Sequence, residues 1–204
     1  MSKKLYQHSL KPCIDFFLAT LALAFLTPLF VIVAILIKLD SKGPIFYTQE
    51  RIGKENKPFT MLKFRSMKIN ADQMGALITH KNDPRLTKMG TLLRRIKLDE
   101  LPQLMNVVKG DMAIVGPRPE VKKYIEKFKK EYEEILEIKP GITDFATLEY
   151  VDEEAILATF KDKEQGYITE VLPQKIKLSK RYKRELSFRV DMRLIIKTLA
   201  KIIA

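Results

Sequence analysis

The sequence predicts an α/β protein, mostly helical with a small β-hairpin or sheet, that carries a membrane-embedded N-terminal segment. Three observations predict this class. Residues 14–37 form an apolar run, two β-leaning runs with a turn between them follow it, and the rest shows helical spacing punctuated by Asp, Pro and Gly. We therefore expect a membrane segment at residues 1–40 and a water-exposed domain at residues 41–204.

The charge balance predicts an anionic partner. The 204 residues include 37 Lys and Arg against 25 Asp and Glu, a net charge of +12. Such an excess is typical of proteins that bind nucleic acid, lipid headgroups or phosphorylated ligands. A single cysteine, Cys13, excludes an internal disulfide framework and a cysteine-rich zinc site, and the two distant histidines, His8 and His80, argue against a histidine metal centre.

The apolar run at residues 14–37 is long enough to cross a bilayer. Asp15 at its edge is its only charge, and the uncharged remainder would form a helix about 33 Å long against a bilayer core of about 30 Å. The run is longer than a typical signal-peptide core, and residues 38–40 offer no small-residue cleavage site after it. We therefore expect the segment to remain in the mature protein.

The topology of this segment stays open on physical grounds. Lysines flank both ends, so the positive-inside rule gives no clear orientation, and both ends on the cytoplasmic side would satisfy it. Pro28 frees the carbonyl of Ala24 and bends the helix, while the Thr27 hydroxyl can bond back to a carbonyl one turn earlier. Physics alone favours a kinked spanning helix over a re-entrant, hairpin-like helix, and both are consistent with these residues.

A hairpin and a helix are expected next. Short β-leaning runs at residues 44–52 and 59–67 are joined by the turn-like residues 53–58, which predicts a β-hairpin. Residues 70–86 are interpreted as a polar loop or short helix. Residues 86–98 then show helical spacing with a basic cluster near their end.

Asp99 is expected to cap the helix that follows. Residues 100–108 are apolar-periodic, Pro102 lies in the first turn, and Lys109-Gly110 closes the run, which is the usual punctuation of a helix. Residues 116–119, with the sequence Gly-Pro-Arg-Pro, predict a rigid turn.

Further helices are predicted in the C-terminal half. Residues 120–137 form a charged amphipathic pattern that Pro140-Gly141 breaks, and residues 152–160 suggest another short helix. From Lys175 onward, basic residues are interspersed with apolar ones. This pattern is typical of a helix on a membrane surface and equally of an ordinary surface helix over the core.

Residues 94–104 hold the side chains best suited to chemistry. If Asp99 caps the helix, the free backbone N–H groups there and Arg94 would hold its carboxylate ionised and could also bind a phosphate. An ionised carboxylate aimed at phosphorus can form a covalent acyl phosphate, and the neighbouring Glu100 could bind Mg²⁺ or transfer protons. The alternative is that Asp99 is only a cap and Glu100 a solvated acid, and the spacing alone favours that alternative.

Other basic residues are candidates for binding a substrate phosphate. Arg65, next but one to Lys63, could clamp a phosphate with its bidentate fork, or could face solvent from a strand. Arg118, fixed between two prolines, would lose little entropy on holding an anion, or could be a turn residue without a ligand.

Several motifs in one order carry a resemblance to a known family. They are Thr27-Pro28, residues 49–53, residues 63–67, residues 98–104, residues 109–112, residues 116–119 and residues 140–143. In this order they resemble the small monotopic phosphoglycosyl transferases, the bacterial sugar transferases that start glycan assembly on polyprenol phosphate. The resemblance covers nearly the whole chain.

The resemblance implies a reaction and the residues that perform it. In this family the Asp of an Asp-Glu pair attacks the sugar-bearing phosphate of a UDP-sugar, UMP leaves, and polyprenol (undecaprenyl) phosphate then takes the phosphosugar to give polyprenol-diphosphate-sugar. Carried over, Asp99 is the nucleophile and Glu100 its partner near Mg²⁺, so that the two carboxylates form the metal site. The substrate-binding residues would be Lys63, Arg65, Arg94 and Arg118.

The resemblance also implies a topology and a location. The family's apolar segment is a re-entrant helix broken at Ser-Pro, and Thr27-Pro28 stands in that place, which favours a monotopic protein with a re-entrant N-terminal helix. The catalytic domain would lie on the cytoplasmic face of the bacterial inner membrane, with its basic C-terminal helix on the lipid surface. Residues 144–147 depart from the family's pattern and are expected to take part in sugar selection, so the sugar stays open.

Two rival functions are compatible with part of the sequence. A non-catalytic membrane-tethered module that binds nucleic acid or lipid would explain the charge and the apolar run, but not the ordered acid and arginine motifs. No helix-turn-helix or zinc-finger pattern is present, so nucleic acid is not an expected partner. A phosphatase with an aspartate nucleophile would be expected to carry an Asp-x-Asp-x-Thr order, which is absent.

Overall fold

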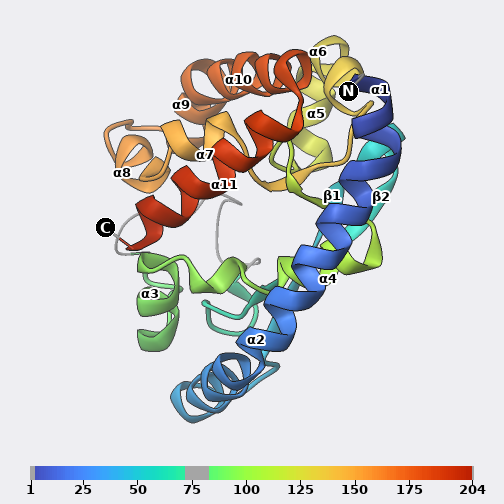
Figure 1. The fold of residues 1–204 in the computed structure, drawn as a ribbon. Helices are drawn as coiled ribbons and strands as arrows, with labels where there is room; N and C mark the ends of the chain where they lie inside the picture. Colours follow the sequence, from blue (N-terminus) through green and yellow to red (C-terminus); the bar gives the residue numbers. More distant parts are fainter. Residues whose placement is uncertain (1–2, 72–82, 204) are drawn as a thin grey trace.

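The computed structural model describes residues 3–71 and 83–203 as a mostly helical fold with two small sheets (Figure 1). The N-terminal helical stretch comprises α1 (Lys3–Leu5), η1 (Tyr6–Leu10) and α2 (Lys11–Asp40). The elements that follow are β1 (Phe46–Ile52), η2 (Lys54–Asn56), β2 (Pro58–Phe64), α3 (Lys88–Arg95), η4 (Leu98–Glu100), α4 (Gln103–Lys109), β3 (Ala113–Val115), α5 (Lys122–Lys127), α6 (Lys129–Ile135), β4 (Gly141–Thr143), α7 (Phe145–Glu149), α8 (Glu153–Ala158), α9 (Lys163–Gly166), η5 (Tyr167–Val171), α10 (Leu172–Glu185) and α11 (Phe188–Ile203). Most of the polar stretch predicted at residues 70–86, with His80, lies outside the described residues.

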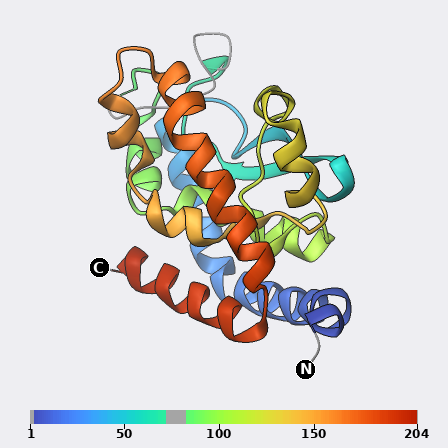
Figure 2. The ribbon, with the colours of Figure 1, turned by 90° about the horizontal axis from the view of Figure 1, so that it is seen from above.

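The N-terminal helical stretch contains the predicted membrane segment and is the candidate for it in the structure. Within the described part of the chain, Lys3–Asp40 is the stretch long and apolar enough to cross a membrane by length and composition. Pro28 lies inside α2, and the Thr27 hydroxyl donates to the carbonyl of Leu23 at 2.8 Å, as the sequence predicts. Figures 1 and 2 show that α2 changes direction part way along, which is the bend expected where a proline interrupts the hydrogen-bond ladder.

Both ends of α2 are bonded to the rest of the chain. At the start, Lys11 Nζ donates to Asp191 Oδ2 at 2.6 Å. At the end, the carboxylate of Asp40 accepts from the backbone N–H of Met89 at 3.0 Å, and Ile37 is buried with Leu93. The membrane segment therefore lies against one and the same domain along its two halves.

The predicted hairpin is confirmed. β1 and β2 pair antiparallel from Phe46 opposite Phe64 to Ile52 opposite Pro58, with η2 as the turn. A second sheet, in which β3 pairs parallel with β4, was not predicted from the sequence. At that sheet the backbones approach so closely that a Cβ added to Gly141 would lie 2.1 Å from the backbone nitrogen of Gly116, which explains glycine there.

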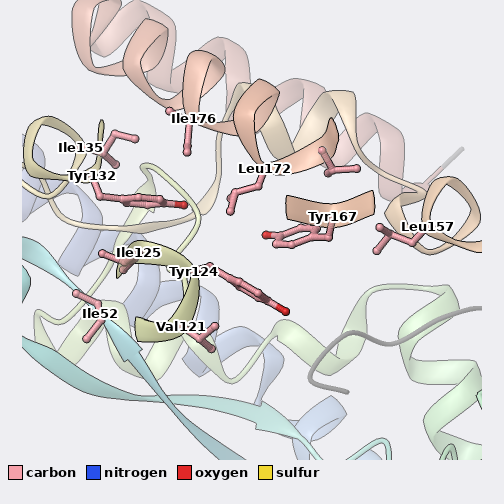
Figure 3. Packing of buried hydrophobic residues seen from close by; sticks show 11 residues of the cluster. Ile52, Val121, Tyr124, Ile125, Tyr132, Ile135, Leu157, Tyr167, Leu172 and Ile176 are labelled. Carbon is pink, nitrogen blue, oxygen red and sulfur yellow. The ribbon is translucent and has the colours of Figure 1, made fainter. Parts of the chain in front are cut away.

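The largest core cluster lies between α10, η5, the two helices α5 and α6, and the end of the hairpin (Figure 3). Tyr124 and Tyr167 stack at a tilt with ring centroids 5.1 Å apart, and Leu172 packs beside them. The helix predicted at residues 120–137 is in fact two helices, α5 and α6, broken at Phe128. The break lets apolar side chains from both helices reach this one cluster.

The basic C-terminal stretch also divides into two helices, α10 and α11. α10 buries one face, including Ile176 and Tyr182, so it is an ordinary surface helix over the core. α11 exposes Phe188, Ile196 and Leu199 beside basic side chains, which keeps the membrane-surface interpretation for this helix alone.

Asp191 of α11 is the centre of a buried polar cluster that fixes the start of the membrane segment. Besides Lys11, it accepts from the hydroxyl of Tyr6 at 2.7 Å and from the hydroxyl of Tyr182 at 2.7 Å. A buried carboxylate that accepts several hydrogen bonds, one of them from an ammonium group, is well compensated. Asp191 of α11 therefore ties η1, α2 and α10 together.

Candidate active site

One cavity collects almost all of the candidate residues. It has a volume of about 660 Å³, and Lys63, Arg94, Asp99, Glu100 and Arg118 line it. Apolar side chains line the cavity where it meets the membrane segment and the last helix: Ala22 and Leu26 of α2, and Ile195 and Leu199 of α11. A charged region and an apolar region therefore share one cavity, and the apolar region borders α2 and α11.

Asp99 lies in the short 3₁₀ turn η4, which follows Lys97 in a left-handed conformation (φ 56°). The helix expected to begin at residue 100 begins at Gln103, with Pro102 in the N-cap position. The prediction that Asp99 caps this helix is therefore wrong. The reason is local, because the N–H of Leu101 closes a tight turn onto the carbonyl of Leu98 before the helix starts.

The electrostatic setting of Asp99 also differs from the expectation. The residue is 4 % exposed, and its carboxylate has no hydrogen-bond or ion-pair partner within the described residues. Burial and the adjacent charge of Glu100 raise the pKa of Asp99, against the opposing charges of Lys63 and Arg94. Asp99 is therefore a desolvated acid whose oxygens are free for a ligand, rather than one held ionised by a helix start.

Glu100, unlike Asp99, has hydrogen-bond and ion-pair partners. Its carboxylate accepts from Lys63 Nζ at 2.8 Å and from both terminal nitrogens of Arg118, with Nη1 at 3.1 Å from Oε2. Burial raises the pKa of Glu100, but the charges and hydrogen bonds of Arg118 and Lys63 outweigh it and hold the pKa well below its usual range. Glu100 is thus ionised and orients two cations toward the cavity.

Lys63 and Arg118 carry the positive charge of this cluster. Burial and the nearby Arg118 lower the pKa of Lys63, although the Glu100 carboxylate partly restores it. Arg118 sits in the predicted Gly-Pro-Arg-Pro turn, whose Pro117 carbonyl accepts from the N–H of Gly141 at 2.9 Å. The structure therefore brings together Lys63, Glu100 and Arg118 by direct contact.

Arg94 reaches the same cavity from α3, but it has an acidic partner there. Its Nε lies 3.1 Å from Oε1 of Glu154 in α8, and its Nη2 contacts the same oxygen. Its positive charge is close enough to lower the pKa of Asp99.

Arg65 has a different place from the other candidates. Its guanidinium donates to the backbone carbonyls of Ser41 at 2.7 Å and Lys42, and to the Ser41 hydroxyl at 2.9 Å. These are acceptors just past the end of α2, where a helix leaves carbonyl groups unpaired. Arg65 lines the cavity, but its donors fasten the end of the membrane segment and not the cluster around Glu100.

Residues 144–147, which are expected to take part in sugar selection, fall into two pairs with different surroundings. Asp144 is fully buried and caps α7, since its Oδ1 accepts from the backbone N–H of Thr147 at 2.8 Å. Phe145 packs against the ring of Tyr182. Only Ala146 and Thr147 of these four residues line the cavity, so they alone are positioned to meet a ligand.

A chain of buried and partly buried polar side chains beside the cluster was not predicted from the sequence. Arg51 donates to Glu120 at 2.9 Å, the Tyr167 hydroxyl also donates to Glu120, and Lys175 donates to Glu153 at 2.8 Å. All five line the cavity. The only signal in the sequence was position, because Arg51 belongs to the motif at residues 49–53 and Glu120 directly follows the Pro-Arg-Pro turn.

The predicted metal residues are two adjacent carboxylates. No group of three or more His, Cys, Asp or Glu side chains that could hold a metal ion occurs in the part of the chain that the structure describes. Mg²⁺ is, however, commonly bound through one or two carboxylates with substrate phosphates completing its shell. The unpaired oxygens of Asp99 fit that mode of binding, in which the substrate supplies the missing ligands. Glu100 could add only the acceptor site that remains on Oε2, since its Oε1 accepts from both Lys63 and Arg118.

Comparison with known proteins places the chain in a family. The model of the bacterial sugar transferases matches residues 6–204. A Bacillus subtilis protein named "Putative undecaprenyl-phosphate N-acetylgalactosaminyl 1-phosphate transferase" is 49% identical over 123 residues, which cover 60% of this chain and 69% of the relative.

Two longer relatives match as well. The UDP-N-acetylgalactosamine-undecaprenyl-phosphate N-acetylgalactosaminephosphotransferase of Aeromonas hydrophila is 41% identical over 67% of this chain and 33% of its own length. The UDP-glucose:undecaprenyl-phosphate glucose-1-phosphate transferase of Xanthomonas campestris is 37% identical over 93% of this chain and 38% of its own length. The match thus spans about a third of the length of each of these two relatives. With a family match over nearly its whole length and the acid-cation cluster in its cavity, the chain belongs to the bacterial sugar transferase family.

Proposed function

We propose that this chain is a phosphoglycosyl transferase that moves a sugar 1-phosphate from a UDP-sugar to polyprenol (undecaprenyl) phosphate. The observation that carries the proposal is Asp99, a buried carboxylate without a partner within the described residues, beside a glutamate that orients two cations. The names of the relatives, which act on undecaprenyl phosphate, support the same reaction class.

The proposed reaction has two displacements at one phosphorus atom. In the first, a carboxylate oxygen of Asp99 forms a bond to the sugar-bearing phosphorus, the bond from that phosphorus to the bridging oxygen breaks, and UMP leaves with the electron pair. In the second, a phosphate oxygen of the polyprenol phosphate attacks the same phosphorus. The bond to Asp99 breaks, the carboxylate is restored, and polyprenol-diphosphate-sugar is released.

The surrounding side chains explain how such a carboxylate could approach a dianion. Lys63 and Arg118, held by Glu100, place fixed positive charge where the diphosphate must lie, and Arg94 adds a third cation to the cavity. Mg²⁺, which Asp99 and Glu100 would hold together with the substrate phosphates, would neutralise further charge on the leaving group. Because Asp99 is desolvated before the substrate arrives, it loses little hydration on attack.

The placement of the membrane segment supports a monotopic topology. Lys11 at its start and Asp40 at its end both bond to the same domain, although they lie about 44 Å apart along an ideal helix. A helix that crossed the bilayer would place those ends on opposite faces. We therefore propose that α2 re-enters at Thr27-Pro28, with the domain on the cytoplasmic face of the inner membrane and α11 on the lipid surface.

The nucleophile is tested by trapping it. Wild-type protein incubated with UDP-sugar and Mg²⁺, without polyprenol phosphate, should acquire the mass of one phosphosugar on Asp99 and release one equivalent of UMP. Asp99→Asn should do neither, whereas the control Asp162→Asn, which alters an exposed helix cap, should behave as wild type. Turnover that requires both substrates at once, with no adduct, would reject the two-step reaction.

The topology is tested separately by labelling. In a Cys13→Ser background, single cysteines at Ser9 and Lys42, both exposed, report on the two ends of the segment. A membrane-impermeant maleimide should modify both from the same side in oriented vesicles. Modification from opposite sides would reject the re-entrant helix and leave the chemistry unaffected.

A further inference from the structure

Two adjacent acids at the start of α8 hold this helix across the cavity. Glu153 pairs with Lys175 of α10, with Nζ 2.8 Å from Oε2, and Glu154 pairs with Arg94 of α3. Asp152 caps the helix through the backbone N–H of Ala155 at 3.3 Å. α8 is therefore fastened on one side to the core helix and on the other to an arginine of the candidate active site.

The two ion pairs differ in how far water reaches their cations, because the two acids, Glu153 and Glu154, are about equally exposed. The Lys175 side chain is 9% exposed and its ammonium group lies 5.2 Å from the centroid of the Tyr167 ring, so the cation of the first pair is largely shielded from water. The Glu154 and Arg94 side chains are 31% and 24% exposed, so solvent and ions reach this pair. Ion pairs that water reaches contribute little, and a competing anion exchanges them readily.

The contact on Arg94 occupies the part of the guanidinium that a phosphate would use. Glu154 Oε1 accepts from both Nε and Nη2 of Arg94. This edge, with two parallel N–H groups, is the one that binds carboxylate and phosphate oxygens in the same geometry. A phosphate and the Glu154 carboxylate therefore cannot both use it.

We infer that Glu154 is a residue of the donor site that occupies Arg94 when the site is empty and yields it to the sugar-bearing phosphate of the nucleotide sugar. This inference rests on the proposed function, since it takes a nucleoside diphosphate as the ligand. Glu154 then lowers the affinity for the donor by competing with it for Arg94. Whenever the donor binds, the start of α8 loses the ion pair between Glu154 and Arg94. The pair between Glu153 and Lys175 remains and keeps the helix beside the cavity.

The affinity for UDP and UMP tests the competition. UDP carries the phosphate that bears the sugar in the donor, and UMP lacks it. On the full chain in detergent, with constant Mg²⁺ and low salt, calorimetry should show that Glu154→Gln binds UDP about two- to fivefold more tightly than wild type, the range that a partly exposed ion pair supports. UMP should gain much less, because its phosphate does not need Arg94.

Matched variants separate competition from other effects. Glu134→Gln removes the same charge from an exposed acid that pairs with Lys180 at 3.3 Å and does not line the cavity, so it should leave UDP binding unchanged. Glu154→Ala, which also removes the acceptor oxygen of glutamine, should match or exceed the gain of Glu154→Gln. In an Arg94→Lys background the gain should shrink, because lysine lacks the paired N–H edge.

The binding results distinguish failure of the inference on Glu154 from failure of the proposed function. UDP binding that is unchanged or weaker in both Glu154 variants overturns the inference, and so does an equal gain in Glu134→Gln, which would make the effect one of net charge. If wild type and variants bind neither UDP nor UMP, the proposed nucleotide donor itself fails, and the inference falls with it.

Discussion

Replacing Asp99 with Asn is expected to make the protein more stable while it removes turnover. The side chain is buried, has no partner within the described residues, and lies beside the negative charge of Glu100. Asparagine has nearly the same shape and leaves the same two polar atoms without partners, so the difference between the two side chains is the buried charge. Removing that charge relieves both the lost hydration and the repulsion from Glu100.

The size of the gain follows from this setting. Replacements that relieve a strained or desolvated functional group commonly stabilise by about 0.5–2 kcal/mol, and we expect about 1 kcal/mol at pH 8. For a chain of this length, 1 kcal/mol shifts the unfolding midpoint by about 2–4 °C.

The raised pKa of Asp99 determines how the stability gain of Asp99→Asn changes with pH. Because burial and Glu100 raise the pKa of Asp99 in the folded state, the folded protein holds this proton more tightly than the unfolded chain does. The group's contribution to stability is therefore full below the ordinary aspartate pKa of 3.8 and is lost as the pH rises through the folded value. The advantage of Asp99→Asn should accordingly be larger at pH 8 than at pH 5.

The assay is thermal unfolding of wild type and variant in the same detergent at both pH values, without substrate. Asp162→Asn, an exposed cap, supplies the control for a generic Asp-to-Asn change and should show no pH-dependent gain. A variant that is less stable than wild type at pH 8, or a gain of equal size at both pH values, would refute the claim that Asp99 is held as a desolvated, unpaired acid.

Three other changes test separate parts of the structure. Glu100→Gln should cost about 1–3 kcal/mol and lower UMP release at least tenfold, because two cations lose the carboxylate that orients them; unchanged release would remove Glu100 from the site. Asp191→Asn should destabilise by about 3–5 kcal/mol in thermal unfolding, since it leaves Lys11 without its closest acid, and a cost below that of Asp162→Asn would contradict the cluster. Arg65→Lys should cost about 1–3 kcal/mol with little change in KM; a raised KM at unchanged stability would return Arg65 to substrate binding.

Much of the fold could be predicted because its signals are local. Apolar runs, periodicity or turn residues within a short window predict the apolar N-terminal segment, the hairpin and the helix capped by Asp152. The strands β3 and β4 could not be predicted in this way, because each has three residues and each exists only through its pairing with the other. The break at Phe128 likewise could not be predicted, because it depends on how α5 and α6 pack against a core formed by residues distant in the sequence.

The sequence motifs indicated which residues lie at the candidate site, but not how buried these residues are or which partners they have. The residues that the motifs singled out, Asp99, Glu100 and Arg118, line one cavity, and their roles there stay predictions. The helix-start argument, however, gave the wrong surroundings for Asp99, because this residue does not cap the helix. Its burial is a tertiary property that spacing does not encode. The same holds for the pair of Arg94 and Glu154, whose partners lie 60 residues apart.

The cluster around Asp191 has a consequence for how this protein is made. Lys11 and its acid partner Asp191 are separated by 180 positions in the chain, so a ribosome synthesises the apolar helix long before the residue that secures its start. The start of the helix therefore lacks Asp191 as its partner until synthesis is nearly complete, and its final attachment to α11 can form only then. Shortening the nascent chain before residue 191 should yield a product that reaches the membrane yet never acquires the protease resistance of the finished protein.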